Sequence, residues 1–250
     1  MNQSKEEIKQ YSYGFIFPFL LKKYWFWFTR PLDVAGAAMV NFFSYEKYDI
    51  PGFKRTDGLT TVIDLNQGLE EIWLETRKKF IRKQIKRGER NGILVKQDPN
   101  FGEFKKIYEV FRKNSQLPRD NISVYKKNTI LLAAYHQGKM IAGGIFISNG
   151  IYYRALVLAS LHKVSGNRSR EIIGQANRMI IWEAIKNAKQ TKHKLFDLGG
   201  ISPDSSNKHL VSLAEFKEAF GGQRQACYYY FKIYSPLIKM WMRFRGFKNI

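Results

Sequence analysis

Hydrophobic positions follow their most regular pattern in the second half of the chain. Three apolar runs lie at residues 129–135, 140–148 and 151–159, and short polar turns, the second of them Asn149-Gly150, join them. An Asn-Gly pair between two apolar runs is the strongest short signal for a β-hairpin. The pattern therefore predicts three strands in an antiparallel meander.

Helical periodicity flanks this predicted meander. Apolar residues recur at helical spacing from residue 101 to residue 111, in a segment that ends before Pro118. They recur again over 171–189, after a loop at 165–170 that is rich in Ser, Gly, Asn and Arg. The sequence therefore predicts one helix before the meander and a longer one after it.

A glycine pair lies at the end of the next predicted strand. The strand is short and apolar, covers 195–198 and stops at Gly199-Gly200, and a helix follows that ends at Gly221-Gly222. Glycine lets the backbone turn sharply and lets a ligand approach it closely. Because a strand, a helix and another strand in succession favour a parallel crossover, this half is predicted to be α/β with a mixed sheet.

The first third of the chain is more irregular. Residues 11–28 are strongly aromatic, but Pro18 and Lys22-Lys23 interrupt them, so no apolar run reaches the roughly 20 residues that a membrane-spanning helix needs. Two interpretations remain open: a packed segment that covers the core, or an anchor at the headgroup level of a membrane. A β-branched strand is predicted at 60–65.

A strongly basic helix is predicted over 69–91. Eight cations, Arg82 and Lys86 among them, occupy most of the surface beside its apolar face. They are either an ordinary solvated face or a surface that binds the phosphates of RNA or of lipid headgroups.

Composition narrows the classes of partner. The chain has 250 residues and a formal net charge of +21, which predicts attraction to nucleic acid, anionic lipid or a phosphorylated substrate. Cys227 is the only cysteine, so disulfides and cysteine-based zinc sites within one chain are excluded and a reducing cytosol is expected. The four histidines lack metal-ligand spacing, and no metal site is expected.

Four segments resemble the Fem family of non-ribosomal aminoacyltransferases and its GNAT-like relatives: YYRALVLAS, IGQANRMIIWEAIKNA, FDLGGISP and SLAEFKEAFGG. The order of the predicted elements is also that of the GNAT acyltransferase fold. The resemblance implies a GNAT-like α/β fold with a reduced N-terminal subdomain. Residues 1–97, with the basic helix 69–91, are expected to form that subdomain, and 98–250 the acyltransferase domain with a basic aromatic tail.

The resemblance also implies an activity. An aminoacyl group passes from aminoacyl-tRNA to an amine of a cell-wall peptide precursor that is lipid-linked or nucleotide-linked, with no permanently bound cofactor. The enzyme is expected in the cytoplasm, with peripheral contact to anionic lipid at the inner membrane face left open. One alternative is a GNAT enzyme that moves an acyl group from acyl-CoA to a small amine or sugar nucleotide. Another is a non-catalytic relative that binds RNA or membranes.

The resemblance places Lys217, with its neighbour Phe216, at the active site, where the cation stabilises negative charge or holds the acyl-tRNA end. Asp197 is expected either to orient the amine or act as a base, or to cap the turn at Gly199-Gly200. Two further substrate-binding candidates, Tyr153 and Arg154, are neighbours on one strand, so at most one of them faces a cleft. A backbone N–H of that strand is expected to meet the oxyanion.

The coenzyme A alternative can be tested against a motif. GNAT enzymes carry Arg/Gln-x-x-Gly-x-Gly/Ala at the start of the long helix, where backbone N–H groups bind the pyrophosphate. Gly174 and Ala176 match the last two positions, but Glu171 stands at the first, where an acidic residue is unfavourable. Arg168 and Arg170 remain candidates to reach a phosphate from the preceding loop.

Overall fold

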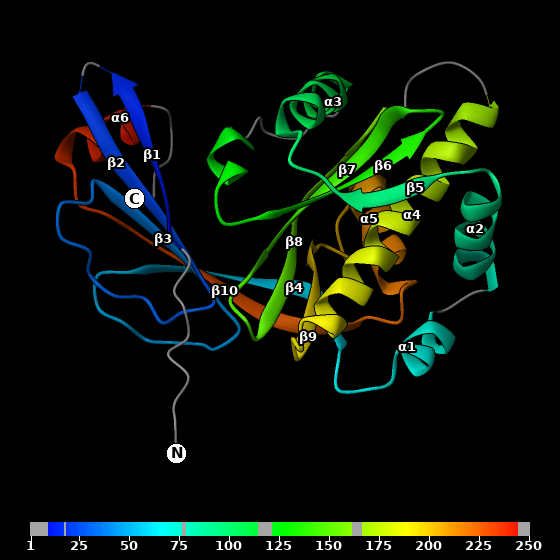
Figure 1. Cartoon of the computed structure of the whole chain (residues 1–250). Helices are drawn as coiled ribbons and strands as arrows, with labels where there is room; N and C mark the ends of the chain where they lie inside the picture. The colour runs from blue at the N-terminus through cyan, green and yellow to red at the C-terminus, as the bar shows by residue number, and fades with distance from the viewer. Residues whose placement is uncertain (1–9, 18, 77–78, 115–121, 162–166, 245–250) are drawn as a thin grey trace. The chain divides into compact units, whose positions relative to one another are not determined.

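The computed structural model describes residues 10–17, 19–76, 79–114, 122–161 and 167–244 (Figure 1). It divides into two compact units: Thr60–Arg224, and Met1–Leu59 with Gln225–Ile250. This division differs from the expected boundary between residues 97 and 98. The basic helical region packs with the acyltransferase elements, whereas the C-terminal strand pairs with an amino-terminal one.

The larger unit, Thr60–Arg224, contains a mixed sheet whose strands lie in the order β4-β9-β8-β7-β6-β5. The bounds of these strands are Lys54–Asp64 (β4), Leu94–Gln97 (β5), Ile130–His136 (β6), Lys139–Ser148 (β7), Tyr152–Ser160 (β8) and Leu195–Ile201 (β9). Strands β6, β7 and β8 pair antiparallel in sequence, so the predicted meander is confirmed. β9 pairs parallel to β8, which confirms the predicted crossover.

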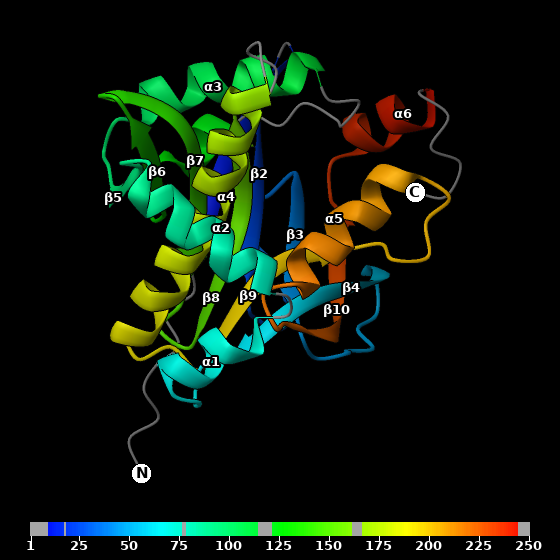
Figure 2. The same ribbon diagram turned by 90° about the vertical axis from the view of Figure 1, so that its right-hand side faces the viewer.

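Helices cover both faces of this sheet (Figure 1). The long helix α4, Asn167–Gln190, lies on one face with α2, Lys79–Arg90, packed on it, and α3, Phe101–Asn114, lies on the other. A short 3-10 helix follows α3 at Ile122–Lys126. Two shorter helices, α1 at Leu69–Glu75 and α5 at Lys208–Glu218, complete the unit, and α5 packs against β9 (Figure 2).

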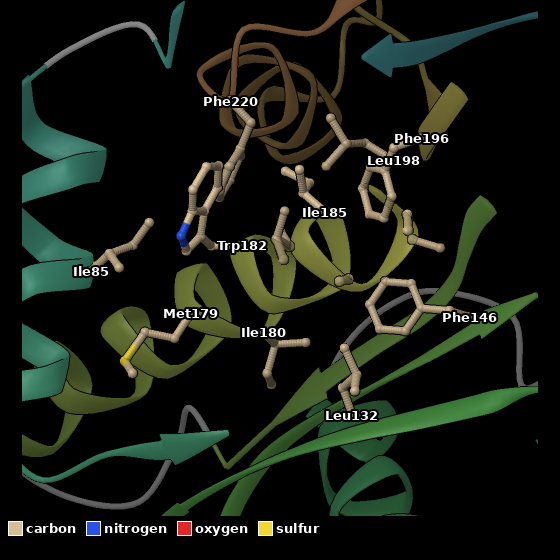
Figure 3. Close-up of a cluster of buried hydrophobic side chains, with 14 of the residues drawn as sticks. Ile85, Leu132, Phe146, Met179, Ile180, Trp182, Ile185, Phe196, Leu198 and Phe220 are labelled. Carbon is tan, nitrogen blue, oxygen red and sulfur yellow. The ribbon is translucent and has the colours of Figure 1, made fainter. Parts of the chain in front are cut away.

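The main core lies between the sheet and α4. Figure 3 shows side chains of α2, α4 and the strands converging there, with Phe146 and Phe196 from the sheet, Trp182 from α4, and Phe220 from the turn that follows α5. Gly88 permits the close approach of α2 to α4, because a Cβ at this position would lie 2.4 Å from the sulfur of Met179.

Three predicted boundaries are wrong. The basic helix is two helices, because α1 ends at its C-cap Thr76, whose N–H donates to Ile72 O. Helix α4 begins at Asn167 rather than at residue 171, so part of the expected loop is its first turn. β9 continues through Gly199 and Gly200, where the strand was expected to stop, because Gly199 takes a φ of +90°.

The smaller unit also contains a sheet, with the strand order β1-β2-β3-β10. Its strands are Gln10–Phe17 (β1), Phe19–Trp27 (β2), Met39–Ser44 (β3) and Gln223–Ile233 (β10), and α6 follows at Pro236–Phe244. The aromatic segment therefore forms a β-hairpin, and Phe26, Trp27 and Phe28 are buried. This supports the packed interpretation for these three residues. The aromatic C-terminal strand is confirmed as β10, and the side chains of 241–250 lie outside the described part.

Candidate active site

Strands β8 and β9 run side by side for only a short distance. Their ladder has three pairs and ends at Arg154 opposite Asp197. Just beyond this point β8 carries a bulge, because Ile145 and Phe146 of β7 face Val157 and Ala155, which leaves Leu156 as an extra residue. The candidate site lies where this pairing ends.

A buried polar cluster occupies this position. Arg154 forms an ion pair with Asp197 Oδ2, and both residues are almost completely shielded from solvent. Thr60 Oγ1 donates to Asp197 Oδ1 at 2.5 Å, and the N–H of Gly199 donates to the same oxygen at 2.6 Å. The N–H of Gly199 thus bonds to Asp197 as expected of a cap, but the backbone continues there as strand β9 and makes no turn.

Lys217 adds a second cation to this cluster. Its side chain is 8% exposed, and Nζ donates to Gly200 O at 2.7 Å. Burial, reinforced by the nearby charge of Arg154 and partly opposed by Asp197, lowers the pKa of Lys217 to about 8. At neutral pH the ammonium form therefore still predominates, and the cluster holds two cations against one carboxylate.

The position of Lys217 follows from local structure. Helix α5 begins at the N-cap Asn207, whose side chain accepts from His209 N. Phe216 in the helix and Phe220 in the turn just after it pack on the core, with their rings 5.5 Å apart, and this orientation directs Lys217 towards β9. Gly199 keeps space for the ammonium, because a Cβ there would lie 3.3 Å from Lys217 Nζ.

Tyr153 and Arg154 lie on opposite faces of β8, as expected for neighbours on a strand. Arg154 belongs to the polar cluster, whereas Tyr153 is in the hydrophobic core, its ring 5.7 Å from that of Phe196. Its hydroxyl is buried and makes no hydrogen bond, and burial raises its pKa. Of the two candidates, the structure brings only Arg154 into the site.

The expected phosphate loop lies inside helix α4. The helix begins four residues before Glu171, so the N–H groups of the motif that contains Gly174 are bonded within the helix and cannot bind a pyrophosphate. Glu171 pairs with Arg87 at 3.3 Å, and both line a cavity of about 380 Å³ with Arg90, Asn91 and Ile172. Arg170 is exposed near the start of α4, and the side chain of Arg168 lies outside the described part of the chain.

The basic helical region has mixed roles. Arg82 lies within 3.4–3.5 Å of the carbonyl oxygens of Trp73 and Leu74, where it satisfies the C-terminal end of α1. Lys86 is exposed on α2. The structure therefore gives Arg82 a structural contact and leaves Lys86 accessible.

Sequence patterns do not single out Thr60, although the structure places it in the buried polar cluster. Thr60 is one β-branched residue among several in its strand, and no local signal distinguishes it.

Within the described ranges, no group of His, Cys, Asp or Glu could hold a metal ion. None of the helices so described is long and apolar enough to cross a membrane.

The architecture is that of the Fem and GNAT-like acyltransferases. A solved structure of FemX superposes with a TM-score of 0.60 over 93% of this chain and 90% of its own, at 12% identity. The C-terminal domain of a protein from Agrobacterium fabrum assigned as a lysylphosphatidylglycerol synthetase gives 0.53, 11% identity, and coverage of 88% and 80%. L-PGS from Bacillus licheniformis gives 0.51, 16% identity, and coverage of 83% and 72%. The sequence matches no family model and no curated protein.

These similarities confirm the expected Fem/GNAT-like α/β fold. Identities of 11–16% show the fold alone. The activity must therefore be argued from the site.

Proposed function

We propose that this protein is an acyltransferase that moves an aminoacyl group from aminoacyl-tRNA to an amine of a cell-wall peptide precursor. The observation that carries the proposal is the excess positive charge in the buried cluster of Lys217, Arg154 and Asp197. Because two buried cations share one carboxylate, the cluster favours an anion that develops or binds beside it. The oxyanion of an acyl-transfer intermediate is such an anion.

The reaction needs few side chains. The acceptor amine attacks the ester carbonyl carbon, a C–N bond forms, the C–O bond to the ribose breaks, and the ribose oxygen leaves with a proton. We assign Lys217 to the oxygen that becomes negative, because it is cationic at neutral pH. A backbone N–H near the bulge at Leu156 is a second candidate donor to it.

Asp197 is better suited to hold the cluster than to accept a proton. Its carboxylate already accepts from Thr60, Gly199 and Arg154. A proton acceptor needs a free lone pair that points at the substrate. We therefore assign Asp197 to positioning Arg154 and balancing the charge of Lys217.

Two observations favour aminoacyl-tRNA over acyl-CoA as the donor. The N–H groups that a coenzyme A pyrophosphate would need are bonded within α4, and Glu171 lies beside them. The net charge of +21 also suits a polyanionic donor.

A second acceptor class is supported by one of the structural neighbours. The Agrobacterium fabrum protein is assigned as a lysylphosphatidylglycerol synthetase, whose product is an aminoacylated phospholipid. An anionic lipid headgroup would also suit the basic surface of this chain. The test therefore includes a lipid acceptor.

The experiment incubates the purified protein with tRNA that carries a radiolabelled amino acid, together with a lipid-linked wall precursor or phosphatidylglycerol vesicles. We expect label in the peptide precursor, and loss of at least 100-fold in rate for Lys217→Met, since one oxyanion donor contributes that much. Lys105→Met on the exposed face of α3 is the matched control. Label in the lipid alone would favour the second acceptor. Transfer from acyl-CoA but not from tRNA, or full activity of Lys217→Met, would refute the proposal.

A further inference from the structure

A guanidinium in the larger unit lies close to two phenyl rings. The guanidinium carbon of Arg178, in α4, lies 5.2 Å from the ring centroid of Phe80 in α2 and 5.4 Å from that of Phe216 in α5. At such distances each ring face attracts the cation. Three helices that are far apart in the sequence thus contribute to one arginine environment.

Arg178 carries hydrogen-bonding capacity that the protein does not use. One of its nitrogens donates to Gly174 O at 2.6 Å, but Nε is shielded from solvent and makes no hydrogen bond. No acidic side chain within the described part of the chain pairs with it. Arg178 is partly buried, and guanidinium groups with nitrogens shielded from solvent are ordinarily paired with a carboxylate or a phosphate, because an unpaired charge is costly.

The position of Arg178 relates it to the candidate active site. Phe216, one of the two rings, is the residue before Lys217. Arg178 itself lies well inside α4, about 16 Å along the axis from Asn167 at 1.5 Å per residue, so an anion there would be bound by the side chain and not by the helix N-terminus. On the other side, Phe80 is 51% exposed, although it belongs to a helix whose other large apolar residues, Ile81 and Ile85, are buried.

An arginine beside an accessible aromatic ring suits one kind of ligand. The guanidinium N–H groups match a phosphate, and an exposed phenyl ring provides a surface on which a base stacks. A free carboxylate would bind the guanidinium but would not stack on the phenyl ring. The pair therefore favours a nucleotide.

We propose that Arg178, Phe80 and Phe216 form a subsite for a nucleotide of the acyl donor, with its phosphate on Arg178 and its base against Phe80. The inference rests on the proposed function, because it assigns the bound nucleotide to the donor. Aminoacyl-tRNA and acyl-CoA both contain an adenine nucleotide, so adenosine monophosphate is a suitable probe for either donor.

The test measures binding of AMP and of adenosine by isothermal titration calorimetry. Wild type is compared with Arg178→Met, which keeps the length of the side chain, with Arg178→Lys, which keeps the charge but loses the planar donors, and with Phe80→Leu. Lys105→Met is again the control, and thermal melting without ligand verifies that each variant is folded. We expect Arg178→Met to weaken AMP binding about tenfold to a hundredfold, Arg178→Lys to weaken it less, and Lys105→Met to leave it unchanged.

The donor is identified by repeating the titration with deacylated tRNA and with coenzyme A. Binding that depends on Arg178 for either ligand supports the subsite and indicates which donor uses it. Equal AMP affinity of wild type and Arg178→Met, equal affinity of wild type for AMP and adenosine, or no AMP binding by wild type would overturn the inference. Binding of AMP through Arg178 without any aminoacyl transfer would retain the subsite and refute the proposed function instead.

Discussion

Replacement of Lys217 by methionine is expected to stabilise the protein while it removes transfer activity. The pKa of Lys217 is lowered from 10.5 to about 8, and at 1.36 kcal/mol per pH unit this corresponds to about 3 kcal/mol by which folding disfavours the protonated lysine. Methionine retains the apolar contacts of the stem but leaves Gly200 O without its donor, at a cost of about 1 kcal/mol. The net expectation at pH 7 is a gain of about 2 kcal/mol in the free energy of unfolding.

The stability gain of Lys217→Met depends on pH, and this dependence distinguishes the removal of a buried charge from a change in packing. Between pH 8 and pH 10.5 the unfolded chain binds more protons at Lys217 than the folded protein does, so the stability of wild type rises with pH in that window. The advantage of Lys217→Met should therefore be complete below pH 8 and shrink as the pH approaches 10.5. Urea unfolding at pH 7, 9 and 10 measures it, with Lys105→Met as a control that should change by less than about 0.5 kcal/mol.

Two outcomes would refute this reasoning. A Lys217→Met variant that is less stable than wild type at pH 7, by an amount that does not vary up to pH 10, would show that the lysine serves packing and not charge. Full stability with full transfer activity would show that the cation has no role in the reaction.

Three further predictions concern the same unit. Asp197→Asn leaves two buried cations without their counter-charge, and urea unfolding should show a loss of about 3–5 kcal/mol together with reduced transfer. At Gly199, where φ is +90°, a Cβ would lie 3.2–3.3 Å from its neighbours. Gly199→Ala should therefore lose more stability than Gly138→Ala, because Gly138 has a φ of +74° but its Cβ would meet nothing within 4 Å. Equal losses would contradict the close approach at Gly199. Gly88→Ala should destabilise by about 1–3 kcal/mol because of the clash between α2 and α4, whereas Gly102→Ala on an open helix surface should stabilise by up to about 1 kcal/mol. Thermal or urea unfolding measures whether each variant gains or loses stability.

The buried polar cluster at the candidate site shows how far the sequence could predict which residues meet there. Lys217 and Asp197 were identified from the resemblance and from the glycines beside them, but nothing local indicated that Arg154 would lie opposite Asp197. That pairing is set by the parallel register of β8 and β9, which depends on how α4 crosses the sheet. For the same reason Thr60, which comes from 137 residues before Asp197, was missed.

The sequence alone determined the elements whose signals are local. The meander followed from alternating apolar runs and an Asn-Gly turn, and the helices on either side of it from apolar spacing, because both depend on residues a few positions apart. Local signals did not determine the element boundaries, since the start of α4 and the continuation of β9 through Gly199 depend on neighbouring elements that hold the backbone there.

Only the tertiary structure decided which residues share an environment. It separated Tyr153 from Arg154, placed Lys217 at the end of the β8–β9 ladder, and brought Arg178 close to rings from two other helices. Charge and burial act through space: burial lowers the pKa of Lys217 most, and the two charged residues that modify it, Asp197 and Arg154, are 20 and 63 positions away along the chain. A lysine that is unremarkable in its helix is therefore a buried cation in the fold.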